Sequence, residues 1–344
     1  MKRIIPLCLA LIMTVGLLAG CGKQNEPAAS DETRLRVVTT IFPEYDWVRE
    51  ILGDKADNAE VTMLLDNGAD LHSYQPTADD IIKISECDLF IYVGGESDDW
   101  VDDALKNAAN KNMKVINLLE ALGERVKTEE AVEGMQEEKH DHDHDHDHED
   151  ADEHDDAKDH DHEEEAEYDE HVWLSLKNAQ TLCSAISAVL QQIDPDNKDT
   201  YAANASAYIK KLSALDADYQ AAVDAAARKT VLFGDRFPFR YLAEDYGLRY
   251  YAAFAGCSAE SEASFETISF LAGKVDELNL PCVLTIEGVQ HKIAETIVRN
   301  TAAKNQKVLT MDSMQSTTSK DAANGTTYLS VMERNLSVLK EALG

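Results

Sequence analysis

Basic residues are scarce in this chain of 344 residues, which has 32 lysines and arginines against 65 aspartates and glutamates and a formal net charge of −33. Proteins that bind nucleic acid need a basic surface that neutralises phosphates, so we do not expect a nucleic-acid partner. The negative charge is concentrated between Glu129 and Glu170, where 23 acidic and 2 basic residues give a net charge of −21. Cations are therefore the natural partners of this segment.

Paired cysteine motifs are also absent. None of the six cysteines has Cys-x-x-Cys spacing, so no zinc site made of thiolates is indicated. We expect Cys87, Cys183, Cys257 and Cys282 to be buried free thiols, although an oxidising compartment permits a bridge such as Cys257–Cys282. His-Glu-x-x-His and serine-nucleophile motifs are missing too, which disfavours a metalloenzyme such as a zinc hydrolase.

Long apolar runs are missing after the N-terminus. The run Ile4–Leu18 is too short to span ~30 Å of hydrocarbon comfortably. Together with Leu18-Ala19-Gly20-Cys21 it looks like a bacterial lipoprotein signal, in which residues 1–20 are removed and Cys21 is lipidated. A flexible tether over residues 21–33 would then hold the protein at the outer face of the cytoplasmic membrane.

Histidine is abundant in one place, because eight of the eleven histidines lie between His140 and His162, most of them alternating with aspartate. Imidazole and carboxylate both bind first-row transition metals, and a tract without apolar runs lets several of them converge on one ion. The expected auxiliary metal ligands are His140, His142, His144, His146, His148, His154, His160 and His162. We expect a disordered loop over residues 129–168 that collects metal at low affinity or senses metal sufficiency.

Two sets of four short apolar runs are predicted to be strands. They are residues 35–41, 60–65, 88–94 and 114–118, followed by residues 230–234, 249–254, 282–287 and 307–311. Segments with helical spacing separate them, and this alternation predicts parallel sheets with helices on both faces. Between the sets, apolar residues in steps of four and three from Tyr201 to Val223 predict one long amphipathic helix within Asp199–Arg228.

The predicted fold is therefore α/β, with two lobes of four-stranded parallel βα units joined by one long rigid helix of ~45 Å. The expected boundaries are an N-terminal lobe over 34–174, a connecting helical segment over 175–228 and a C-terminal lobe over 229–344. Ligands of open α/β sheets bind outside the carboxyl ends of the strands. A cleft between the lobes is the expected site of a metal ion.

Metal-ligating residues follow several of the predicted strands. His72 follows the second run, His171 follows the acidic tract, and Asp235 and Asp312 follow the fifth and eighth runs. Two histidines and two carboxylates can form a four-coordinate zinc or manganese site. Glu287, which follows the seventh run, is a secondary candidate.

The segment Gly-Ala-Asp-Leu-His-Ser-Tyr-Gln-Pro-Thr at 68–77, the segment His-Val-Trp-Leu at 171–174, the His-rich insertion and the Asp312 region carry a family resemblance. In this order, over nearly the whole mature chain, they resemble the zinc and manganese solute-binding lipoproteins of bacterial ABC importers. The resemblance implies one ion between two lobes, with His72 and His171 as ligands from the first lobe and Asp312 from the second. It also implies an importer permease and its ATPase as partners of a monomer.

The chain departs from the family pattern after the fifth run, where the family usually has His-x-x-Phe-Gly-Tyr. The register from Tyr241 places Arg236 at the histidine position, and a guanidinium has no lone pair for a metal. A shift of one residue would let Asp235 serve instead; alternatively, Asp235 pairs with Arg236 or Arg240 or accepts a turn hydrogen bond. His291, which opens a predicted helix, is expected to be a surface histidine.

The expected cargo is Zn²⁺, because His-rich insertions accompany zinc in the resembling family and imidazole favours zinc over manganese. The expected function is an extracytoplasmic receptor that captures this ion and delivers it to an ABC importer. Two alternatives stay open. One is a manganese or iron receptor of the same family, and the other is a surface lipoprotein that uses its loop for metal storage or adhesion.

Overall fold

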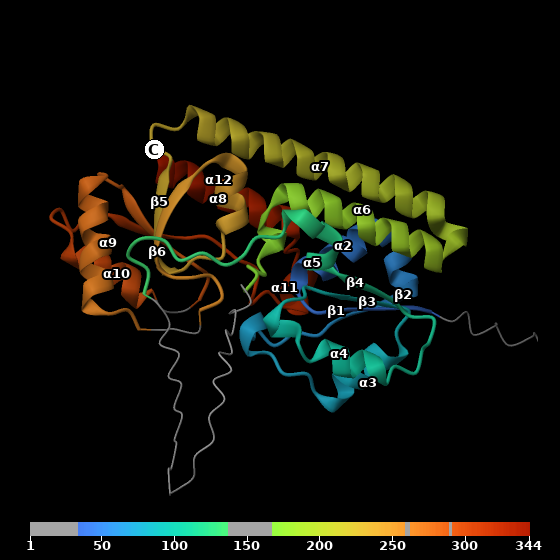
Figure 1. Cartoon of the computed structure of the whole chain (residues 1–344). Coiled ribbons are helices and arrows are strands. Elements are labelled where there is room, and N and C mark those ends of the chain that lie inside the picture. The colour runs from blue at the N-terminus through green and yellow to red at the C-terminus, as the bar shows by residue number, and fades with distance from the viewer. Residues whose placement is uncertain (1–33, 137–166, 259–261, 289–290) are drawn as a thin grey trace, which may run out of the picture. The chain divides into compact units, whose positions relative to one another are not determined.

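The computed structural model describes residues 34–136, 167–258, 262–288 and 291–344, of which Leu35–Gly344 belong to one compact unit. Figure 1 shows the arrangement of the helices and strands. The predicted signal peptide, Cys21, the tether and the eight tract histidines lie outside the described residues. Within the described residues, no helix combines the length and apolar character needed to cross a membrane.

The first sheet has the strand order β2-β1-β3-β4, and its strands are parallel. The strands are β1 (Leu35–Thr39), β2 (Ala59–Met63), β3 (Leu89–Tyr92) and β4 (Lys114–Asn117). The helices around it are α2 (Phe42–Leu52), α3 (Ala78–Glu86), α4 (Val101–Lys106) and α5 (Leu118–Leu122), with 3-10 turns η1 (Gly53–Asn58), η2 (Leu71–Ser73), η3 (Glu96–Asp98) and η4 (Gly123–Arg125). In its central strands, three of the five residues of β1 and three of the four residues of β3 are buried, as expected in a covered parallel sheet.

The second sheet repeats this topology with the order β6-β5-β7-β8, again parallel. Its strands are β5 (Thr230–Arg236), β6 (Arg249–Phe254), β7 (Cys282–Thr285) and β8 (Lys307–Thr310). Its helices are α8 (Arg240–Tyr246), α9 (Phe265–Glu277), α10 (Lys292–Asn300), α11 (Ser319–Ala323) and α12 (Tyr328–Leu343). The predicted α/β class with two four-stranded parallel sheets is confirmed.

A pair of long helices connects the two sheets. After η5 (Val172–Leu174) come α6 (Leu176–Ile193), η6 (Pro195–Asn197) and α7 (Lys198–Ala225), so the predicted long helix is confirmed. The apolar stripe of α7 is buried along its whole length at Tyr201, Ala205, Tyr208, Leu212, Leu215, Tyr219 and Val223. Figure 1 shows α7 alongside α6, and α7 also contacts α2 of the first lobe and α8 and α12 of the second.

The C-terminal helix α12 ties the second lobe to the first. The backbone N–H of Tyr328 donates to Asp46 of α2 at 2.9 Å, and the Tyr328 hydroxyl donates to the carbonyl of Trp173 at 2.7 Å. The Trp173 indole N–H in turn donates to the carbonyl of Ser313 at 2.9 Å, after β8. These buried contacts cross the predicted lobe boundaries at residues 174 and 228. The boundaries therefore remain a prediction.

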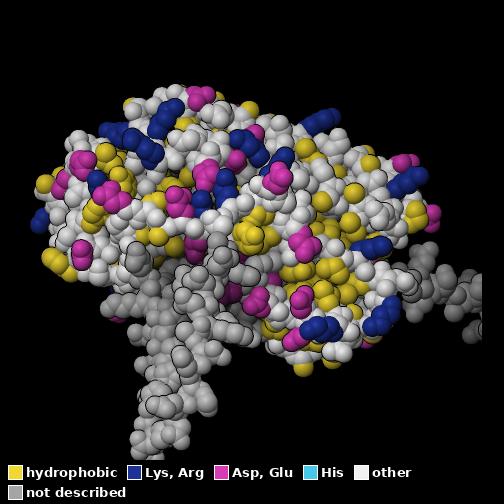
Figure 2. All heavy atoms as spheres, viewed as in Figure 1, with side chains coloured by type: hydrophobic (Ala, Val, Ile, Leu, Met, Phe, Trp, Pro, Cys, Tyr) yellow, Lys and Arg dark blue, Asp and Glu magenta, His cyan; other side chains and the backbone are white. Residues whose placement is uncertain are grey.

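The four cysteines among the described residues are free thiols, and three of them, Cys87, Cys183 and Cys282, are buried as expected. Cys257 is partly exposed in the loop after β6. On the face that Figure 2 shows, lysines and arginines lie interspersed with acidic side chains.

Asp46 is buried on α2, and this burial raises its pKa from 3.8 to about 7, with the nearby Glu50 adding to the rise. The hydrogen bond from Tyr328 and the charge of Arg49 oppose it. The folded protein holds the proton of the Asp46 carboxyl group more tightly than the unfolded chain does. The contribution of this protonated group to the free energy of unfolding is therefore fully present below about pH 3.8 and is lost as the pH rises through 7. Asp46→Asn keeps an oxygen that can accept from Tyr328 and removes the charge.

We therefore expect Asp46→Asn to be more stable than the parent at pH 8, by at most about 4 kcal/mol, with a smaller gain at pH 5. Urea unfolding of both proteins at the two pH values measures this difference. The exposed Asp54→Asn serves as the control and should behave like the parent. Parallel pH dependences for Asp46→Asn and the parent would contradict the burial argument.

Candidate metal centre

His72 is positioned by a tight turn after β2. Gly68 has a φ of +74°, a conformation that glycine adopts without strain, and the chain then enters η2. Asp70 caps η2, because its Oδ1 accepts from the backbone N–H of His72 at 3.1 Å. The His72 side chain is 14% exposed. The carboxyl end of β2 thus presents a nearly buried imidazole whose backbone is held by a neighbouring carboxylate.

His171 is held by Asp169 just before η5. One oxygen of Asp169, Oδ1, accepts from the His171 backbone N–H at 2.9 Å and lies 3.0 Å from the ring Nδ1. The His171 side chain is fully buried. A carboxylate on Nδ1 holds the proton there, so that Nε2 of the ring presents its lone pair.

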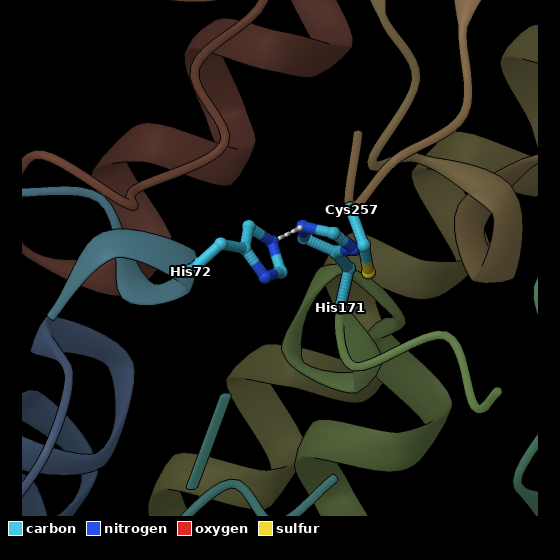
Figure 3. Close-up of side chains that lie close together, drawn as sticks. All are labelled: His72, His171 and Cys257. Carbon is cyan, nitrogen blue, oxygen red and sulfur yellow. Dashed lines mark hydrogen bonds between the residues drawn. The ribbon is translucent and has the colours of Figure 1, made fainter. Parts of the chain in front are cut away.

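The two imidazoles face each other through their Nε2 atoms, which are 3.3 Å apart (Figure 3). Two nitrogens that each lie about 2.0–2.1 Å from a tetrahedral zinc ion are themselves about 3.3 Å apart. The 3.3 Å separation of the two Nε2 atoms therefore already matches the spacing that a zinc ion between them would need.

Glu170 supplies the matching acceptor for His72. Its Oε1 accepts from the Ser97 backbone at 2.9 Å, whereas its Oε2 is buried without a hydrogen-bond partner among the described residues. This oxygen lies 3.4 Å from Nδ1 of His72, which also contacts the Ser97 hydroxyl at 2.8 Å. When Nε2 of His72 binds a metal, Nδ1 must carry the proton, and the buried Oε2 then gains its donor.

Burial and the neighbouring His171 lower the pKa of His72 to about 3. Burial also raises the pKa of Glu170. His72 is therefore neutral at physiological pH, which is the form of imidazole that coordinates a metal.

Cys257 is the third member of this site. Within the described residues, the side chains that gather closely enough to hold a metal are His72, His171 and Cys257, whose ligand atoms all lie within 4.8 Å of one another. Burial raises the pKa of the Cys257 thiol, helped by the carboxylates around it, so the metal-free thiol is neutral. Sequence reasoning treated this residue as a structural thiol. Its place three residues after a predicted strand was the signal that could have marked it.

The structure does not bring Asp235 to this group. Its Oδ2 accepts from the Thr285 hydroxyl at 2.6 Å, and its Oδ1 accepts from the Arg236 backbone at 2.9 Å. The Arg236 guanidinium pairs with Asp70 of the other lobe at 2.5 Å. Arg236 thus stands at the expected ligand position and forms an ion pair between the lobes.

Asp312 and Glu287 also lie outside the group. The Oδ1 of Asp312 accepts from the Met314 backbone at 2.9 Å, and its Oδ2 lies 3.6 Å from the Arg334 guanidinium. Glu287 accepts from the backbone and the hydroxyl of Ser313 at 2.6 and 2.7 Å. Both carboxylates shape the loop after β8.

His291 is not a fully exposed surface residue. It is half-buried, and its Nδ1 lies 3.1 Å from the Thr285 hydroxyl. It is not part of the metal-ligating group of the described residues.

The start of the acidic segment is packed on the second sheet, although the sequence placed it in a disordered loop. Oε1 of Glu129 accepts from the Cys257 backbone at 2.8 Å, and the Gln136 backbone donates to the Ala253 carbonyl at 2.9 Å. Thr128 forms an antiparallel bridge with Tyr168. The two ends of the His-rich insertion are therefore joined beside the metal-ligating group.

Known proteins match this chain over almost its whole length. The model of a family described as zinc-uptake complex component A, periplasmic (ZnuA), matches residues 37–342. The high-affinity zinc uptake system protein ZnuA of Bacillus subtilis (strain 168) is 31% identical over 329 residues, covering 95% of this chain and 94% of that protein.

The zinc-binding lipoprotein AdcA of Streptococcus pneumoniae is 32% identical over 341 residues, covering 99% of this chain. The chain spans 61% of the length of that relative. A crystal structure of the Zn(II)-bound ZnuA-like domain of the same AdcA has a TM-score of 0.66 and 28% identity, covering 90% of this chain and 99% of that domain.

The contact between Asp169 and His171 predicts a graded effect on metal binding. Asp169→Ala should weaken zinc binding about 10- to 100-fold, the usual effect of losing the carboxylate behind a metal-bound imidazole. Asp169→Asn keeps an acceptor oxygen and should weaken it less. Competition for zinc with a tight chelating dye measures both, with the exposed Asp103→Ala as control. Unchanged affinity in Asp169→Ala would show that Asp169 does not orient His171.

Proposed function

This chain belongs to the family of the zinc-uptake complex component A, and we propose that it captures one zinc ion between loops of its two lobes. The observation that carries the proposal is the pair of buried imidazoles with their Nε2 atoms 3.3 Å apart. In each ring the other nitrogen contacts a carboxylate. Such a pair is preorganised for a first-row divalent ion, because both rings are already oriented and desolvated.

Zinc suits this pair better than manganese. Imidazole nitrogen is a good ligand for zinc, whereas manganese favours carboxylate and water oxygens. The carboxylates of Asp169 and Glu170 contact the Nδ1 atoms of the two rings. They therefore orient the imidazoles and are not themselves placed as ligands at the Nε2 atoms. A manganese or iron receptor of the same family is the alternative, and it would need oxygen ligands in addition to the imidazoles.

The proposed ligands from the first lobe are His72 and His171. Metal ligation by Asp235 and Asp312 remains a prediction from the sequence. We do not include these residues in the proposed ligand set, because their carboxylate oxygens accept hydrogen bonds within the second lobe. Glu287 is left outside for the same reason.

We further propose that Cys21 carries a lipid anchor and that the protein works at the outer face of the cytoplasmic membrane as a monomer. From there the loaded protein would dock on an importer permease driven by an ATPase. These steps rest on the sequence of residues 1–33 and on family membership. The chain is not an enzyme, because its family supplies a component of an uptake complex.

Titration of zinc and, separately, manganese tests the proposal. The protein is the full chain in which the eight tract histidines are asparagine, so that the tract cannot supply imidazole. We expect one tight zinc site and much weaker manganese binding. His72→Ala in this background should weaken zinc binding at least about tenfold, which is about 1.4 kcal/mol. His291→Ala removes a half-buried histidine outside the group and should leave the affinity unchanged.

The other outcomes of these titrations would indicate a different function or a different ligand set. Loss of all tight zinc binding when only the tract is altered would favour the storage or adhesion alternative, in which the His-rich loop is the functional element. Tight manganese binding would indicate a manganese receptor. If Asp235→Asn or Asp312→Asn weakens zinc binding as much as His72→Ala, then that carboxylate belongs to the ligand set.

The His-rich tract should act as an auxiliary collector or sensor. We expect the unaltered chain to bind several additional zinc ions weakly and His144→Asn alone to change little, because neighbouring imidazoles substitute for one another. Equilibrium dialysis over a range of zinc concentrations counts these sites. A loss of tight binding in His144→Asn would contradict the division between tract and tight site.

A further inference from the structure

We propose that Cys257 is the third protein ligand of the bound ion, as a thiolate, in place of the imidazole that is missing at Arg236. The inference rests on the proposed zinc-binding function. It assigns a ligand from the second lobe and makes that ligand a determinant of metal specificity.

The geometry brings the sulfur to the imidazole pair. Cys257 follows β6, and Figure 3 shows its side chain beside His171, with His72 on the other side of that ring. The three ligand atoms lie within 4.8 Å of one another. Around a tetrahedral zinc ion with bonds of about 2.05 Å to nitrogen and 2.3 Å to sulfur, nitrogen and sulfur are about 3.5 Å apart. Relative to that geometry, the longest of the three separations must shorten by at most about 1.3 Å.

The backbone around Cys257 is held from two sides. Glu129 accepts from the Cys257 N–H at 2.8 Å, and the Arg236 guanidinium donates to the Ser258 carbonyl at 3.4 Å. The same guanidinium bonds Asp70, which caps the turn that carries His72. Arg236 thus links the Cys257 loop directly to the His72 loop, although it cannot coordinate an ion itself.

The other cysteines of the described chain have a different setting. Cys87 packs its sulfur against the Met113 sulfur at 3.4 Å, Cys183 is fully buried within α6, and Cys282 starts β7. None of these three belongs to the metal-ligating group. Core packing accounts for them, whereas the partly exposed Cys257 lies among imidazoles.

A thiolate changes what the site selects. Sulfur is a soft ligand that favours zinc and disfavours manganese, so Cys257 would strengthen the preference for zinc that the imidazoles already give. As the sulfur–zinc bond forms, the thiol proton leaves to solvent. Two imidazoles and one thiolate leave a fourth position open, as in zinc sites that exchange a ligand. An open position suits an ion that must later be passed on.

Cobalt(II) is the probe that reports sulfur ligation directly, through a thiolate-to-cobalt charge-transfer band in the near ultraviolet. The protein is the full chain with asparagine at the eight tract histidines, kept reduced. We expect the band in this protein and in Cys282→Ser, the matched control, and its loss in Cys257→Ser. In Cys257→Ser, zinc affinity should fall at least about tenfold relative to manganese affinity.

Each outcome bears on a different claim. Tight cobalt binding without the band, or a band that persists in Cys257→Ser, overturns the thiolate ligand and leaves the imidazole site standing. Absence of tight cobalt and zinc binding in the parent overturns the proposed function itself. An undiminished zinc-over-manganese preference in Cys257→Ser overturns the role of Cys257 in specificity, whatever the spectrum shows.

Discussion

The buried face of α7 is the constraint on which the rest of the structure depends. This helix packs against α6, against α2 of the first lobe and against α8 and α12 of the second, so the two sheets share one support. Tyr219 also bonds across this interface, because its hydroxyl donates to the Met332 carbonyl at 2.7 Å. In parallel α/β sheets the ligand-bearing loops follow the strand ends. The shared support therefore decides whether loops from different sheets can meet at one ion.

Side chains around the two imidazoles also hold them in place before an ion binds. Asp169 and Glu170 lie behind the two imidazoles, and Asp70 holds the turn of His72 while pairing with Arg236 of the other lobe. Arg236 thus links the loop after β6 to the loop that carries His72. Under the proposed function, an ion bound at the two Nε2 atoms would meet rings that are already oriented and desolvated.

The sequence was sufficient for the regular elements and for the imidazole pair. Apolar runs with strand lengths and a stripe in steps of three and four from Tyr201 to Val223 are local signals, so β1 to β8 and α7 could be predicted. His72 and His171 were found because each stands in a distinctive local segment. Their closeness, however, depends on how residues 99 positions apart are brought together.

The rest of the site could not be predicted because local position does not fix the direction of a side chain. Asp235 and Asp312 do follow strands, yet their carboxylates accept nearby backbone and hydroxyl hydrogens. Cys257 does follow a predicted strand, but its closeness to the imidazoles depends on packing, and its hydrogen bond to Glu129 joins residues 128 positions apart. The packing of residues 129–136 on the second sheet was hidden by a composition typical of disorder.

The most direct test of the account is an anomalous difference map from zinc-loaded crystals, collected on either side of the zinc absorption edge. The account predicts one strong peak between the imidazoles, about 2.0–2.1 Å from Nε2 of both His72 and His171. A peak bound elsewhere in the protein, with no density between these two rings, would contradict it.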